Sequence, residues 1–145
     1  MTAKDLLIKQ TQSAFSENSL LSLKGSLKDL SQEEASCKLS DGTRTIEEIV
    51  SHVSSFKIGT CIQEFGNTQL TPDDTSGDIG KAVELLEKAN ENLVTCLQET
   101  PEQDLERAIK MELPFESLGE LIWILIMHDI SHAAQIRTIR RACSE

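Results

Sequence analysis

Apolar side chains recur every three or four residues along four stretches of the chain, which is the spacing of helices that bury one face. We expect these helices at residues 2–18, 45–66, 79–98 and 117–142. The second and fourth begin with Thr or Ser followed three residues later by Glu, at Thr45–Glu48 and Ser117–Glu120, which is the pattern of a capping box. Four amphipathic helices predict an all-α fold, a four-helix bundle. The length suits a single domain over residues 1–145.

The segments between these helices carry weaker signals. Residues 19–39 show no clear period, and we expect a long connection with one short helical piece around Leu27–Leu30. Between Pro101 and Pro114, apolar residues alternate with polar ones, which predicts a partly extended segment. Neither segment changes the all-α assignment.

One stretch of the last predicted helix is apolar around its whole circumference. It spans residues 121–127, which is two turns. Such a helix is covered on every side, so it lies at the centre of the fold or its outer face meets a second subunit. We expect a homodimer. Because this longest apolar run is only seven residues, no membrane span is expected.

The charge of the chain limits its partners. Asp and Glu number 24 against 14 Lys and Arg, which gives a formal net charge of −10. A nucleic-acid partner requires a basic surface, so we expect none. The acidity itself is typical of a soluble exposed surface.

The cysteines indicate a reducing compartment. Cys37, Cys61, Cys96 and Cys143 form no C-x-x-C motif, and the first residues lack the continuous apolar run of a signal peptide. We therefore expect reduced thiols and a cytoplasmic location.

The chain has three histidines, and their placement is unusual. His128 and His132 are four residues apart, so they share one face of the last predicted helix. At about 100° per residue, that face is the apolar stripe that includes Leu125 and Ile136. His52 lies on the second predicted helix, at the edge of its apolar face. Buried imidazoles need polar partners, and one metal ion would serve all three rings if folding brings them together. The alternative is that they partner one another or other core groups.

Three imidazoles suit Zn²⁺ or Ni²⁺ and leave coordination positions open for water or substrate. Glu48 lies one turn before His52 and could orient that ring, although the capping box accounts for Glu48 without this second role. Gln135 follows His132 by three residues and faces the same stripe, where it could contact a ligand or bond within the core.

Other reactive side chains near the predicted ligands receive no catalytic role. Asp129 points about 100° away from His128 around the helix, which indicates the surface or an interface. Cys61 is predicted to be a buried, inert thiol. No general base stands out, so the catalytic residues stay unknown.

With these residues, the chain resembles the DinB-like superfamily. The stretches that carry the resemblance are residues 40–53, 117–121 and 128–136, the last with an H-x-x-x-H pair followed by Gln-Ile. The resemblance implies an up-down-down-up four-helix bundle, often dimeric. It also implies that His52, His128 and His132 bind a divalent metal, usually zinc or nickel. The chain departs from the family at Cys37, where relatives tend to carry an aromatic residue, and this bears on the shape of the pocket mouth.

The first functional hypothesis is a metal-dependent enzyme acting on a small molecule. The resemblance implies transfer of a low-molecular-weight thiol, such as bacillithiol or mycothiol, to an electrophile. Hydrolysis by a metal-activated water is a second enzymatic hypothesis. The alternative is a non-catalytic dimeric bundle, stress-related or structural, with an incidental or regulatory metal site.

Overall fold

The computed structural model describes residues 1–17 and 21–144, and this part of the chain contains helices and loops without a strand. The elements in chain order are α1 (Ala3–Phe15), α2 (Leu23–Ser26), α3 (Gln32–Ser36), α4 (Ile46–Phe65), α5 (Ile79–Glu99), the 3₁₀ helix η1 (Glu102–Glu106) and α6 (Leu118–Cys143). The predicted all-α fold is confirmed, and the four long helices fall on the four predicted stretches. Residue 18 of the first stretch, and residues 19 and 20 of the connection, lie outside the described residues.

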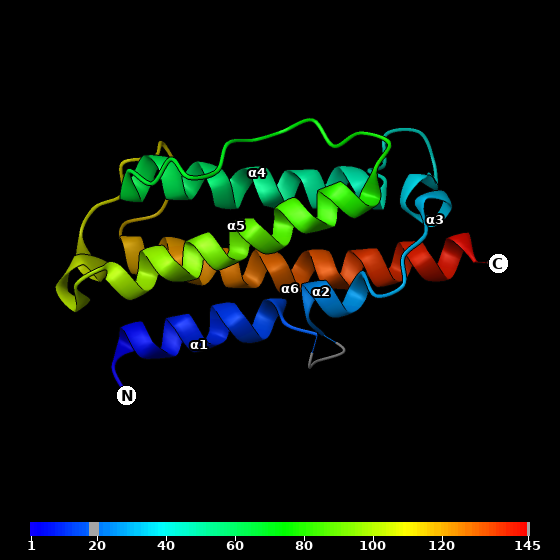
Figure 1. The fold of residues 1–145 in the computed structure, drawn as a ribbon. Helices are drawn as coiled ribbons and strands as arrows, with labels where there is room; N and C mark the ends of the chain where they lie inside the picture. The colour runs from blue at the N-terminus through cyan, green and yellow to red at the C-terminus, as the bar shows by residue number, and fades with distance from the viewer. Residues whose placement is uncertain (18–20, 145) are drawn as a thin grey trace.

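The long helices lie side by side along the molecule. In Figure 1, α1 and α6 run in one direction, and α4 and α5 run in the other. Residues 66–78 return along the length of α4, which is why two consecutive helices run parallel. α6 packs against both α1 and α4. None of the described helices is long and apolar enough to cross a membrane.

The apolar run in α6 is covered on most of its circumference. Leu121, Ile122 and Leu125 are almost fully buried. Trp123 and Met127 keep 49% and 44% of their surface exposed. The stretch is therefore not covered on every side by the described chain itself, and whether a second subunit covers the exposed face stays a prediction.

The connecting segments differ in part from what the sequence predicts. Leu27–Leu30 forms a turn, and short helices lie on either side of it, because the hydroxyls of Ser22 and Ser31 accept hydrogen bonds from backbone N–H groups at 3.1 Å and start α2 and α3 there. The segment after η1 forms no strand within the described chain, although Arg107 at its start has extended backbone angles. The buried carboxylate of Glu64 accepts backbone N–H bonds from Lys110 and Met111 at 2.8–3.0 Å, so this backbone bonds to a side chain instead of to a strand.

A buried ion pair joins α4 to α6. Lys57 Nζ lies 2.7 Å from Asp129 Oδ2 and 2.7 Å from Asn90 Oδ1 of α5, and both charged side chains are nearly inaccessible. The Lys57 ammonium also lies 5.4 Å from the centre of the Phe15 ring of α1. The prediction that Asp129 faces the surface or an interface is wrong. The side of α6 that carries Asp129 lies inside the bundle, about 100° around the helix from His128.

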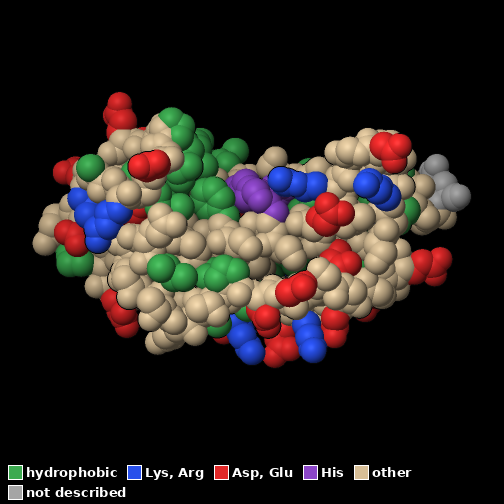
Figure 2. Space-filling model, turned by 90° about the horizontal axis from the view of Figure 1, so that it is seen from above, with side chains coloured by type: hydrophobic (Ala, Val, Ile, Leu, Met, Phe, Trp, Pro, Cys, Tyr) green, Lys and Arg blue, Asp and Glu red, His purple; other side chains and the backbone are tan. Residues whose placement is uncertain are grey.

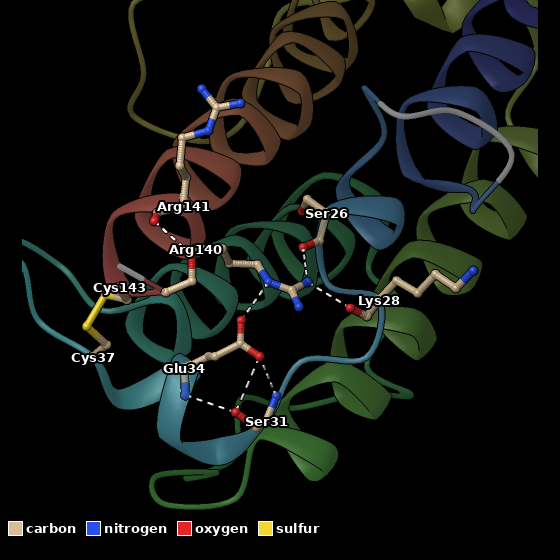
Figure 3. Close-up of polar contacts among 9 residues, drawn as sticks. Ser26, Lys28, Ser31, Glu34, Cys37, Arg140, Arg141 and Cys143 are labelled. Atoms are coloured by element: carbon tan, nitrogen blue, oxygen red, sulfur yellow. Dashed lines mark hydrogen bonds and ion pairs between the residues drawn. A yellow bond between two sulfur atoms is a disulfide. The ribbon is translucent and has the colours of Figure 1, made fainter.

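The end of α6 is attached to the short helices (Figure 3). Arg140 donates to Glu34 Oε2 at 3.1 Å and to the carbonyls of Ser26 and Lys28 at 2.9 and 2.7 Å. A disulfide joins Cys37 to Cys143, 106 residues later. The expectation that all four thiols are reduced is therefore wrong for this pair, since folding brings two distant cysteines together at the end of the bundle.

Breaking the buried ion pair on one side is expected to destabilise the fold strongly. Lys57→Met should lower the free energy of unfolding by about 3–5 kcal/mol, because it leaves the Asp129 carboxylate buried without its counter-charge. The double variant Lys57→Met/Asp129→Leu should regain most of this loss, which urea denaturation would measure. Lys88→Met, which removes an exposed ion pair with Glu84, is the control and should change stability by less than about 1 kcal/mol. A double variant as unstable as the single one would contradict this account.

Candidate metal centre

The three histidines are brought to one place by α4 and α6. His52 lies two turns into α4, whose start is fixed by the Thr45 hydroxyl, the acceptor of the Glu48 N–H bond at 3.1 Å. His128 and His132 occupy successive turns of α6. All three side chains are half-buried, and Figure 2 shows histidine side chains reaching the surface in a shallow hollow. The structure therefore unites residues that are 76 positions apart in the sequence.

The three rings present the same type of atom to a common point. His128 Nε2 lies 3.0 Å from His52 Nε2 and 3.0 Å from His132 Nε2. One ligand atom from each ring lies within 4.8 Å of the other two. The rings meet edge to face, with centres 4.3–5.2 Å apart. This arrangement directs nitrogen atoms at one another instead of at solvent.

Hydrogen bonding alone does not account for both short contacts. A neutral imidazole nitrogen either carries one proton or offers one lone pair. His132 Nδ1 lies 2.9 Å from Gln135 Oε1, so this nitrogen carries the proton and leaves Nε2 as a bare lone pair. His128 Nε2 can then form a normal hydrogen bond with only one of its two neighbours. A cation shared by three lone pairs satisfies every contact.

The neutral state of the imidazole rings also favours binding of a cation. Burial, followed by the nearby charges of His132, His52, Lys57 and Arg44, lowers the pKa of His128 to about 4. Burial, then Arg44 and His132, lowers the pKa of His52 below its usual value. Both rings are therefore neutral at pH 7, which is the form that binds a metal.

The spacing of the nitrogens fits a transition-metal ion. Two nitrogens bound at about 2.0–2.1 Å lie about 2.9 Å apart at a right angle and about 3.3 Å apart at the tetrahedral angle. The observed 3.0 Å falls between these values. Three imidazoles and no fourth protein ligand within the described residues form an open site, the type found in catalytic centres.

The two predicted supporting residues differ in what they contact. Gln135 accepts the bond from His132 Nδ1 and so sets the orientation of that ring. Glu48 is exposed, and its carboxylate accepts a hydrogen bond from the Thr45 hydroxyl at 3.2 Å instead of from the Thr45 backbone N–H, so the predicted capping box is only half formed within the described residues. A role for either in metal binding stays a prediction.

Two neighbours of the site were not singled out as functional from the sequence. The Phe56 ring, one turn after His52, lies 5.3 Å from the His128 ring. Its i+4 spacing from His52 was the available signal. Arg44 precedes the capping residue of α4, and no sequence pattern marked it.

Cys61 takes no part in the centre. It is a free, buried thiol in the structure. A hydrogen bond with Cys96, and then burial, raise the pKa of Cys61, which keeps it protonated at neutral pH. This agrees with the inert role predicted for it.

Comparison with known proteins gives one match. A family model described as the DinB superfamily matches residues 17–136, which is most of the chain. No curated protein and no solved structure is significantly similar to the chain.

The contacts of Gln135 and Glu48 predict different effects on metal affinity. Gln135→Ala should raise the dissociation constant for Zn²⁺ about tenfold or more, because His132 loses the partner that orients it. Glu48→Gln should leave the constant unchanged, since its carboxylate contacts Thr45. Competition with a chromophoric chelator would measure both. Equal losses in the two variants would show that Glu48 supports His52 and would contradict this assignment.

Proposed function

The chain belongs to the DinB superfamily, and we propose that it is a divalent-metal-dependent enzyme in which His52, His128 and His132 hold the ion. The observation that carries the proposal is the meeting of three Nε2 atoms at spacings of 3.0 Å around His128. Zinc or nickel suits three imidazole ligands. The shallow hollow in Figure 2 leaves this centre open to a small molecule.

We further propose that the reaction is transfer of a low-molecular-weight thiol to an electrophile. When bound, a divalent ion would lower the pKa of a coordinated thiol or water and so make either a nucleophile at neutral pH. The carboxylate next to His128 in sequence favours the thiol. Asp129 is buried and paired with Lys57, so it is not free to act as a base for water. A thiol, with a pKa near 8.5, needs much less help to lose its proton.

The neighbouring side chains would position the reactants. Gln135 holds the His132 ring with its lone pair toward the other two histidines. Phe56 covers one side of His128 with an apolar ring, which limits the access of water there. Hydrolysis of a small substrate is the second enzymatic possibility, and a thiol-consumption assay with a panel of electrophiles would distinguish the two.

Metal analysis separates the enzyme from a non-catalytic bundle with an incidental or regulatory metal site. Protein purified without a polyhistidine tag should contain about one zinc or nickel per chain. His128→Ala and His52→Ala should each lose the metal while keeping the helical circular dichroism spectrum. Ser131→Ala, an exposed position between the two α6 ligands, is the control and should retain it. A metal-free protein whose thermal unfolding ignores added Zn²⁺ and Ni²⁺ would count decisively against the proposal.

We also propose that the protein is a homodimer that associates through the exposed face of α6. Trp123, Met127 and Ile130 are partly exposed and, together with Leu21, line an apolar groove between α1 and α6. Large exposed apolar patches mark interaction surfaces.

Substitution on this face is expected to separate the subunits. Trp123→Glu should convert a dimer to a monomer in analytical ultracentrifugation, because it places a charge in the apolar contact. Leu39→Glu, at an exposed apolar position in another part of the molecule, should leave the dimer intact. Native protein that is monomeric at micromolar concentration would refute the association.

The remaining features of the proposal concern the chain as a whole. We propose that residues 1–145 form one domain with up-down-down-up topology, which the helix directions in Figure 1 support. A cytoplasmic location stays a prediction. The Cys37–Cys143 disulfide counts against it, because disulfides are rare in reducing compartments.

A further inference from the structure

Cys37 and Cys143 differ from the other two cysteines of the chain in their exposure. Both are half-buried at the end of the bundle, where their disulfide joins the residue after α3 to the last residue of α6. Cys61 and Cys96 are free thiols and are buried in the core. Because access to the attacked sulfur governs thiol–disulfide exchange, a small thiol in solution can reach this bond and is kept from the two core thiols.

An ion pair lies three residues before the disulfide on both of the elements that the bond joins (Figure 3). Glu34 precedes Cys37 by three residues, and Arg140 precedes Cys143 by three residues. Arg140 Nε donates to Glu34 Oε2 at 3.1 Å. Arg140 Nη1 also donates to two backbone carbonyls, at the end of α2 and just after it, at 2.9 and 2.7 Å. The end of α6 is thus attached here by charge as well as by sulfur.

Helix α3 is also held in place by contacts that do not involve sulfur. A capping box closes its first turn. The side-chain oxygen of Gln32 accepts a hydrogen bond from the Ile79 N–H at 2.7 Å, which ties α3 to the start of α5. Ala35 is fully buried in a core cluster that includes residues of α4 and α6, and Cys143 packs against the same cluster. The fold therefore places Cys37 beside Cys143 without needing the bond between them.

We propose that Cys37 and Cys143 form a reversible redox site, at which the disulfide exchanges with low-molecular-weight thiols while the rest of the fold stays intact. The thiolate of one small thiol attacks a sulfur of the bond, forms a mixed disulfide and releases the other cysteine as a thiolate, which takes up a proton. A second small thiol attacks the small-molecule sulfur of the mixed disulfide and releases the second cysteine. Two small thiols are thereby oxidised to their disulfide, the protein disulfide is reduced to two thiols, and a small disulfide reverses both steps.

Arg140 is the positioning residue of this redox site. When the bond is reduced, its contacts with Glu34 and the two carbonyls hold the end of α6 against α3. The two thiols then stay close together, which raises the effective concentration of one for the other and favours closing the bond again. The exchange needs no bound metal, so this site stands apart from the proposed function of the three histidines.

Equilibration of the native protein with mixtures of reduced and oxidised glutathione tests this site. Free thiols are then blocked by alkylation, and mass spectrometry of the peptides counts the blocked cysteines. The count should rise by two, at Cys37 and Cys143, as the mixture becomes more reducing, and it should fall by two when oxidised glutathione is added back. The helical circular dichroism spectrum should stay unchanged throughout. A bond that is reduced only when the helical spectrum is lost, or that oxidised glutathione does not restore in the folded protein, would overturn the proposal.

Substitution of Arg140 tests its positioning role. Arg140→Gln should lower the equilibrium constant for closing the bond about tenfold, because charge-assisted contacts are lost. Arg141→Gln is the matched control. It removes the same charge from the next residue, which is exposed and points away from Glu34 in Figure 3, and it should leave the constant unchanged. Glu34→Gln removes only the charge of the ion pair and should lower the constant by a smaller factor, which keeps the test decisive if Arg140→Gln fails to fold. A constant that none of these variants changes would overturn the role of Arg140.

Discussion

The packing of α4 against α6 is the constraint on which the candidate centre depends. These two helices supply all three histidines, and the same two helices supply the buried pair Lys57 and Asp129. Lys57 lies five residues after His52, and Asp129 directly follows His128. Because an unpaired buried charge is costly, the ion pair favours one rotation of α6 relative to α4. In that rotation the His128 ring faces His52. The buried pair Lys57–Asp129 therefore helps to fix how the histidine rings of α4 and α6 lie relative to one another.

The centre offers neutral donors to a ligand. Burial is the main cause that lowers the pKa of both His52 and His128, so both rings are uncharged at neutral pH. An ion held by three neutral rings keeps its whole charge, so a negatively charged fourth ligand is favoured electrostatically.

Periodicity predicted the long helices well because each depends on residues three or four positions apart. The same local spacing predicted that His128 and His132 share a face, and that Gln135 lies beside them. It did not predict the partners of Lys57, Glu64 or Cys37. These interactions join residues 33 and 72 positions apart for Lys57, 43–47 for Glu64 and 106 for Cys37. Asp129 was misplaced for a related reason: a helical wheel gives the angle of a side chain, and only the packing of neighbouring helices decides whether that angle leads to water. The two short helices were missed because each is only four or five residues long and shows no apolar period, although Ser31 and Glu34 form a capping box at the start of α3.

The bond between Cys37 and Cys143 makes a covalent ring of everything from the end of α3 to the last turn of α6. All three histidines, both members of the buried ion pair and Arg44 belong to that ring. The helices α1, α2 and α3 precede Cys37 and are therefore outside it, and they pack on the rest of the molecule through non-covalent contacts. Partial opening of the molecule from its N-terminal end would therefore leave the ligand-bearing helices tethered to each other, and the centre could reassemble without a search through the full conformational space of the free chain.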